Sequence, residues 1–233
     1  MRRFHFKHFS MYHDRSTMKV GTDAVMLGAW AEVRPDDWVL DIGTGCGIIA
    51  LMLAQKGAWR IHGVDLDEAS VYEAANNFEA SQWRDRIFAF HADIRRFQLG
   101  CKYDLVISNP PFFLHSYKCD EDRRNQARHT DTSLTFSDLV ISAKRLMKPE
   151  GRLALVLPER ESHDFLSIAG VHNLFPYKIQ EIIPVRGKEP NRLNMELRFG
   201  APQEVITTSL TMRDEENQFT QEYHDFLKDF YLG

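Results

Sequence analysis

The chain has 233 residues, of which 43% are hydrophobic and 27% charged, and its formal net charge is −4 at pH 7. This length and composition suit one sizeable core, so we expect a single domain over residues 1–233. No apolar run approaches the roughly 18 residues that a membrane helix needs. The basic start MRRFHFKHFS also lacks the apolar segment of a signal peptide. These features predict a cytoplasmic protein without membrane contact.

Cysteine usage excludes two further classes of protein. Cys46, Cys101 and Cys119 are odd in number and lack the spacing of metal ligands. Neither a disulfide framework nor a metal site is therefore expected.

Residues 1–30 are predicted to form an arm followed by a short helix. The first 20 residues carry five lysines and arginines against one acid, with aromatic rings between them. This interleaving suits either contact with RNA or an arm that packs a few rings on the domain, and the pattern does not decide between them. Residues 22–30 follow as the short helix, with Thr22 or Asp23 available as its N-cap.

Apolar runs typical of strands then alternate with helical stretches. We expect strands at 38–42, 60–65, 87–91, 103–108 and 152–158, and helices at 48–56, 68–81 and 136–146. This alternation predicts an α/β fold with a doubly wound, Rossmann-like sheet and helices on both faces. Two later runs, 178–184 and 193–199, have a short link and should form an antiparallel hairpin. The last 20 residues are expected to form a helix docked on the core.

The segment VLDIGTGCGIIA combines a strand, a glycine-rich turn and a helix start. Gly43, Gly45 and Gly47 allow a tight turn and the close approach of a ligand to the helix N-terminus. Ile48 stands where the dinucleotide fingerprint has its third glycine, which disfavours an NAD-dependent oxidoreductase. Asp41, before the turn, suits an ammonium group and would repel a pyrophosphate.

Acids follow two further strands of the predicted sheet. Asp65 lies 65 − 41 = 24 residues beyond Asp41, near the roughly 20-residue offset at which an acid meets ribose hydroxyls. Asp93 is placed to accept from an adenine amino group, and Ile94 to pack on the ring. Because open α/β sheets bind ligands at this edge, the acids together predict a pocket for a nucleoside that carries an amino acid.

The strand at 103–108 ends in SNPPFF, where two prolines stop the sheet ladder. The motifs DIGTGCG, VDLD, ADI and NPPF, in this order, resemble the class I S-adenosylmethionine-dependent methyltransferases that act on amino groups. The opening DRSTMKVGTDAVMLGAW and the tail EPNRLNMEL resemble more narrowly the bacterial tRNA1(Val) N6-adenine methyltransferases. Nearly the whole chain is covered by this resemblance.

The resemblance implies a fold, a cofactor and a substrate. The sheet should have the order 3-2-1-4-5-7-6 with the seventh strand antiparallel. S-adenosylmethionine would be the cofactor and tRNA the partner, with methylation of adenosine 37 of tRNA1(Val) by a monomer that needs no metal. Lys19, Thr22 and Asp23 would close over the methionine end of the cofactor, although helix capping explains the last two equally well.

Within SNPPFF, the Asn109 side-chain oxygen and the Pro110 carbonyl would accept the two hydrogens of the target amine and localise its lone pair. Phe112 would stack on the base, with Pro111 and Phe113 beside it. The polar segment 115–130 suits a substrate loop, and its basic residues Arg123, Arg124 and Arg128 would contact phosphates. Its three acids nearly cancel that charge, so a solvated loop is the alternative.

Other acceptors and other classes stay open at this point. The same Asn-Pro-Pro-aromatic element serves N5 methylation of a protein glutamine of the release-factor type and N2 methylation of guanine in ribosomal RNA. A non-catalytic RNA-binding module of the same fold is a further alternative. Arg186, Lys188 and Arg192, on the link between the last two strands, are either RNA contacts or ordinary surface charges.

Overall fold

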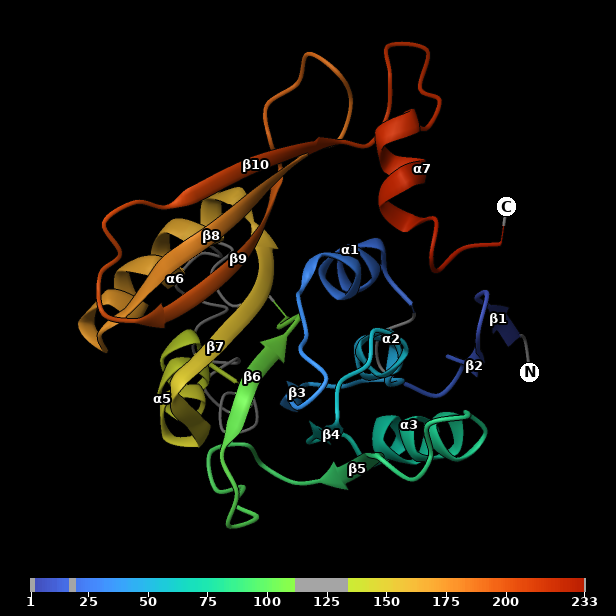
Figure 1. Ribbon diagram of the computed structural model, residues 1–233, viewed down its shortest axis with the longest axis vertical. Helices are drawn as coiled ribbons and strands as arrows, with labels where there is room; N and C mark the ends of the chain where they lie inside the picture. The colour runs from blue at the N-terminus through green and yellow to red at the C-terminus, as the bar shows by residue number, and fades with distance from the viewer. Residues whose placement is uncertain (1–2, 17–19, 112–133, 233) are drawn as a thin grey trace, which may run out of the picture.

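The computed structural model describes residues 3–16, 20–111 and 134–232. Within these residues, eight strands form one sheet in the order β10-β8-β9-β7-β6-β3-β4-β5, and β1 and β2 form a separate pair (Figure 1). The strands of the large sheet are β3 (Trp38–Ile42), β4 (Arg60–Asp65), β5 (Ile87–His91), β6 (Tyr103–Ser108), β7 (Met147–Pro158), β8 (Leu174–Ile183), β9 (Arg192–Phe199) and β10 (Ile206–Thr211).

The order from β5 to β8 is the predicted 3-2-1-4-5-7-6. β9, the seventh strand, is antiparallel to both of its neighbours, β7 and β8, as expected. The predicted number of seven strands was wrong, because β10 adds an eighth strand at the edge of the sheet, parallel to β8. Four of its six residues are exposed, so it lacks the alternation of apolar residues that marks a half-buried strand.

Helices cover both faces of the sheet (Figure 1). α1 (Thr22–Trp30), α2 (Ile48–Gln55), α3 (Glu68–Glu79) and α7 (Gln221–Leu227) lie on one side, and α5 (Phe136–Leu146) and α6 (Glu159–Val171) on the other. α6 was not expected from the sequence. It buries only Ser162, Phe165 and Ala169, so its apolar stripe is too thin to stand out.

Several helices and strands begin or end at residues other than those predicted. The N-cap of α1 is Gly21, not Thr22 or Asp23, because both of these residues already lie inside the helix. β7 begins at Met147 rather than at residue 152, through an irregular stretch in which the register with β6 shifts. α7 is short, so Phe219 and Phe230 lie outside the helix that was expected to carry them.

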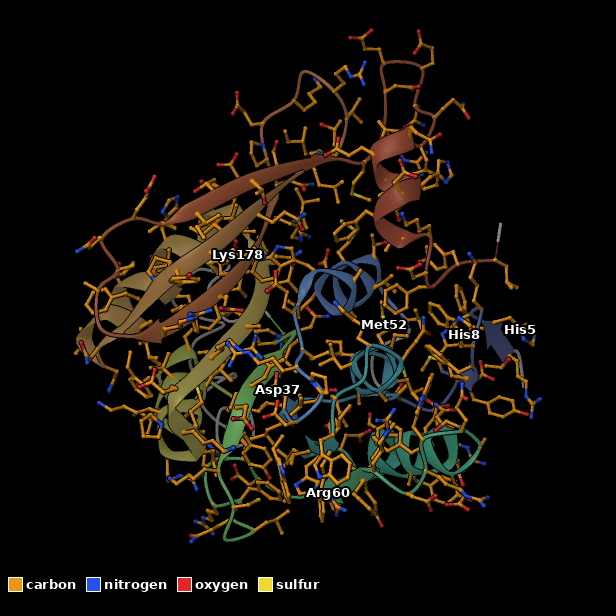
Figure 2. The ribbon with its side chains drawn as sticks, viewed as in Figure 1. His5, His8, Asp37, Met52, Arg60 and Lys178 are labelled. Atoms are coloured by element: carbon orange, nitrogen blue, oxygen red, sulfur yellow. The ribbon has the colours of Figure 1, made fainter. Side chains whose placement is uncertain are left out.

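The N-terminal arm is folded onto the domain. β1 (Arg3–His5) and β2 (Ser10–Tyr12) form an antiparallel hairpin, and Phe6 and Phe9 are buried with their rings stacked at 4.6 Å. Phe6 also stacks on Tyr231 near the C-terminus at 5.7 Å. His5 of β1 and His8 of the turn, both labelled in Figure 2, are exposed. Phe6 and Phe9 therefore pack into the core, and Arg3, Lys7 and Arg15 are exposed.

Helix α1 packs closely against α2, the helix that begins directly after the glycine-rich turn. A Cβ at Gly28 of α1 would lie 2.8 Å from the Met52 sulfur of α2, and Figure 2 shows Met52 between these two helices. Glycine at this position lets α1 approach α2 without displacing the Met52 side chain. In the described residues, no helix is long and apolar enough to cross a membrane.

Candidate active site

The glycine-rich turn joins β3 to α2 at the carboxyl edge of the sheet. Gly43, Gly45 and Gly47 have φ values of 71°, 54° and 87°, a region that other residues rarely adopt. A Cβ at Gly43 or Gly45 would meet nothing within 4 Å, whereas one at Gly47 would lie 2.4 Å from the Phe78 ring of α3. The first two glycines therefore leave space beside the turn, and the third lets α3 pack against it.

Asp41 is fully buried at the end of β3. Its Oδ2 accepts a hydrogen bond from the Thr44 hydroxyl at 2.7 Å. Its Oδ1 has no hydrogen-bond partner among the described residues. Burial, with the neighbouring Asp65 carboxylate, raises the pKa of Asp41 to about 7, although the Thr44 hydroxyl opposes this shift. A buried acceptor of this kind is suited to a donor that carries positive charge.

Asp65 ends β4 and holds the same turn from the other side. Its Oδ2 accepts from the Gly45 N–H at 2.9 Å, and its Oδ1 from the Asp67 N–H at 3.0 Å. Each carboxylate oxygen can accept a second hydrogen bond. Asp65 thus fixes the glycine turn and keeps acceptor capacity for ligand hydroxyls.

Asp93 and Ile94 follow β5 as expected, but both side chains have partners within the protein. Asp93 forms an ion pair with Arg95 at 2.7 Å, and this hydrogen-bonded arginine lowers the pKa of Asp93. Ile94 is 6% exposed and belongs to the apolar cluster on the α5 side of the sheet. Their contact with an adenine ring remains a prediction.

Asn109 and Pro110 stand at the end of β6, next to β3. The strands pair so that Ser108 lies opposite Ile42, and the Ser108 hydroxyl donates to the Ile42 carbonyl at 2.8 Å. Asn109 Oδ1 is buried and has no hydrogen-bond partner among the described residues. Pro110 is buried and Pro111 exposed. The ends of the adjacent strands β3 and β6 therefore carry two acceptors without a partner among the described residues, Asp41 Oδ1 and Asn109 Oδ1.

The start of α1 is tied to the hairpin of β8 and β9. Asp23, in the first turn of α1, forms an ion pair with Arg192 at 3.1 Å. This pair joins residues 169 positions apart in the chain. Thr22 begins the helix. Binding of a cofactor by Thr22 or Asp23 stays a prediction.

Glu73 and Asn77 of α3 are polar residues beside the glycine turn that the sequence analysis did not single out. They are 4% and 2% exposed and bind backbone groups of the arm and of Cys46. A signal was present, because both lie on the helix face that carries the apolar Ala74 and Phe78. Polar residues on an apolar helix face point to buried hydrogen bonds.

Some expected site residues lie outside the described residues: Lys19, Phe112, Phe113, Arg123, Arg124 and Arg128. Their roles stay predictions. Cys46 is described, and burial raises the pKa of its thiol to about 12, which disfavours a thiolate nucleophile. No cluster of possible metal ligands occurs in the part of the chain that the structure describes.

Comparison with known proteins gives a consistent family. Residues 16–168 match the methyltransferase small domain. The tRNA1(Val) (adenine(37)-N6)-methyltransferase of Parabacteroides distasonis is 38% identical over 98% of this chain and 97% of its own length. The Phocaeicola vulgatus protein of the same name is 42% identical over 99% and 97%. The chain belongs to the tRNA1(Val) (adenine(37)-N6)-methyltransferase family. Members of this family are enzymes, so the alternative of a non-catalytic module is disfavoured.

Solved structures show the same fold at low identity. A predicted O-methyltransferase from Agrobacterium tumefaciens matches with a TM-score of 0.67 and 19% identity, over 89% of this chain and 96% of its own. A 16S rRNA N2 G1207 methyltransferase from T. Thermophilus, in complex with AdoMet and guanosine, matches with a TM-score of 0.59 and 20% identity, over 86% and 50%. The Rossmann-like methyltransferase fold is therefore established for this family member.

Proposed function

We propose that this chain transfers a methyl group from S-adenosylmethionine to N6 of an adenine in tRNA, namely adenosine 37 of tRNA1(Val). The observation that carries the proposal is the buried Asn109 Oδ1 at the end of β6, beside the glycine turn, which has no hydrogen-bond partner among the described residues. The names of full-length relatives support the tRNA and the position.

The residues around the glycine turn fit the cofactor. Asp41 Oδ1 offers a buried acceptor for the ammonium group of the methionine part. Asp65 retains acceptor capacity for the ribose hydroxyls, and the space beside Gly43 and Gly45 lets the ligand approach the backbone. When bound, S-adenosylmethionine supplies an electrophilic methyl group on a sulfonium.

The chain's own contribution is to orient the amine. The lone pair of an exocyclic amine is delocalised into the base, which makes it a poor nucleophile. Asn109 Oδ1 and the Pro110 carbonyl would accept its two N–H groups, and the fixed φ of proline holds the turn before the substrate arrives. In-line positioning supplies most of the acceleration, because the methylated amine is acidic and loses its proton to water.

The substrate must reach this turn from an RNA loop. We propose that the adenine leaves its stack and enters between Asn109 and the cofactor site, with Phe112 as a stacking partner and Arg123, Arg124 and Arg128 as phosphate contacts. A monomer acting on tRNA in the cytoplasm, without a metal, is sufficient for this chemistry.

The test is transfer of labelled methyl from S-adenosylmethionine to total tRNA from a strain that lacks the enzyme. Nucleoside analysis should find the label as N6-methyladenosine, and tRNA1(Val) should be the species that carries it. Label on release factor or ribosomal RNA would refute the tRNA assignment, and would retain the Asn109 chemistry. Absence of transfer to all three fractions would refute the proposed activity.

A further inference from the structure

Two buried polar side chains of α3 face the N-terminal arm and the glycine turn together. Glu73 and Asn77 are one helical turn apart, so they project from the same face of α3. Burying a carboxylate and an amide costs free energy unless their hydrogen bonds are made. Their partners therefore show what this face of the helix holds.

Glu73 holds three consecutive backbone amides of the arm. Its Oε1 accepts from Asp14 N–H at 2.8 Å and from Arg15 N–H at 2.9 Å, and its Oε2 accepts from Ser16 N–H at 2.9 Å. Hydrogen bonds to an ionised acceptor are roughly twice as strong as neutral ones. One carboxylate thus fixes the backbone of residues 14–16 against α3.

Asn77 joins the arm directly to the glycine turn. Its Oδ1 accepts from Tyr12 N–H at 2.8 Å, and its Nδ2 donates to the Tyr12 carbonyl at 2.8 Å and to the Cys46 carbonyl at 2.9 Å. Both hydrogens of one amide group are used, one on each segment. One side chain therefore bonds to both the arm and the turn.

Packing reinforces this connection. Phe78 of α3 fills the space that a side chain at position 47 would need, since a Cβ there would lie 2.4 Å from its ring. Phe9 and Met11 of the arm are buried in the same apolar cluster as Cys46 and Phe78. A displacement of the arm would remove contacts from the face of α3 that supports the turn.

We propose that Glu73 and Asn77 are positioning residues that couple the seating of the arm on α3 to the binding of cofactor at the glycine turn. Cofactor binding then stabilises the seated arm, and the seated arm raises cofactor affinity by the same factor, because such coupling is reciprocal. The inference rests on the proposed function only for the identity of the ligand.

The first test is amide hydrogen exchange of the wild-type protein with and without S-adenosylhomocysteine. The amides of Asp14, Arg15 and Ser16 should exchange roughly 5- to 100-fold more slowly when the ligand is bound, which is the usual range of coupling between sites. Binding without added protection of these amides would overturn the coupling. A wild-type protein that does not bind the ligand would instead refute the proposed function.

The second test compares one substitution at two neighbouring positions. Asn77→Asp keeps size and the acceptor but loses both donated hydrogen bonds, and should weaken S-adenosylhomocysteine binding about tenfold. Asn76→Asp is the control, because Asn76 is exposed and, among the described residues, its side chain bonds only to the Tyr72 carbonyl within the helix. It adds the same charge and should change affinity less than about twofold.

A purely structural role predicts a different result. In that case Asn77→Asp would lower the melting temperature while the folded protein kept the wild-type dissociation constant, and the proposal would fail. Should this variant not fold, Glu73→Gln with Glu79→Gln as its exposed counterpart provides the same comparison. Equal affinities of these two variants would count against the coupling.

Discussion

The two halves of the sheet use polar side chains in different ways. Around β3 and β4, carboxylates bind backbone N–H groups and a hydroxyl, and one oxygen of Asp41 keeps no partner among the described residues. Where β7, β8 and β9 face α1, charges pair with one another: Asp37 with Arg152, Arg152 and Arg198 with Glu196, Glu32 with Lys178, and Asp23 with Arg192.

This difference suggests a division between charges that hold the fold and acceptors at the carboxyl edge that await a ligand, although Asn194 Oδ1 of β9 is also buried without a partner among the described residues. Arg152, Asp37 and Glu196 are almost wholly buried, and each has an opposite charge beside it. A buried acceptor without a partner costs free energy in the ligand-free protein, and a ligand that donates to it recovers that energy. We therefore expect changes in the first group to alter stability and changes in the second to alter binding or turnover.

The largest effect is expected at Asn109. Asn109→Ala removes the acceptor that orients the amine, and turnover should fall by about 10²- to 10³-fold, the usual cost of one such group. The dissociation constant of S-adenosylhomocysteine should stay within about twofold of wild type. Steady-state kinetics with tRNA and calorimetric titration measure the two quantities. Unchanged turnover would exclude Asn109 from the reaction.

Breaking the buried ion pair tests the other half of the comparison. Arg152→Met leaves Asp37 and Glu196 without their shared cation, and should lower the free energy of unfolding by about 3–5 kcal/mol. Urea denaturation measures this loss. The affinity for S-adenosylhomocysteine should stay unchanged. Lys178→Met is the matched control, because it breaks the ion pair with Glu32. The Glu32 side chain is 69% exposed, and such a surface pair contributes below about 1 kcal/mol to stability.

Asp65 and Asp67 allow a sharper distinction within one loop. Asp65→Asn weakens the acceptor for ribose hydroxyls and the bond to Gly45, so cofactor affinity should fall roughly 10- to 100-fold. Asp67→Asn changes the N-cap of α3, which accepts from Ser70 N–H at 2.8 Å, and should cost at most about 1 kcal/mol of stability. Similar losses of affinity in both variants would remove Asp65 from the binding site.

The smallest effect concerns pH. The pKa of Asp41 is raised from 3.8 to about 7, so protonation stabilises the ligand-free fold, and this contribution disappears as pH rises from about 4 through 7. Binding of an ammonium group needs the carboxylate form. Affinity for S-adenosylhomocysteine should therefore fall up to about tenfold between pH 8 and pH 6. The slope should vanish in Asp41→Asn; an equal slope in that variant would assign the effect to another group.

The sequence predicted best those features in which the spacing of residues depends on the conformation of the backbone. The three glycines of the turn have the positive φ values that their pattern predicts. The three acids lie at the carboxyl ends of successive strands, with Asp41 and Asp65 in the final residues of β3 and β4 and Asp93 two residues after β5. The ion-pair partners of these and other acids were not predictable. Nothing in the sequence pairs Arg95 with Asp93 in place of a ligand, or Arg192 with Asp23.

Elements with weak hydrophobic patterns were also missed. β10 is mostly exposed, and α6 buries a single large side chain, Phe165. β10 is held by its pairing with β8, and α6 by packing against α5 and against β7, β8 and β9. Tertiary contacts decided these elements, and such contacts leave little local trace in the sequence.

The stacking of Phe6 on Tyr231 has a consequence for the order of synthesis. The Lys7 N–H also donates to the Phe230 carbonyl at 2.8 Å, and both termini lie at the same side of the molecule (Figure 1). The arm thus takes its final place against residues that are synthesised 230 − 7 = 223 positions later. A nascent chain should keep its arm exposed until residues 230 and 231 have left the ribosome. Pulse proteolysis of ribosome-bound chains would show this as cleavage near residue 8 that stops once these residues have emerged, and earlier protection would contradict it.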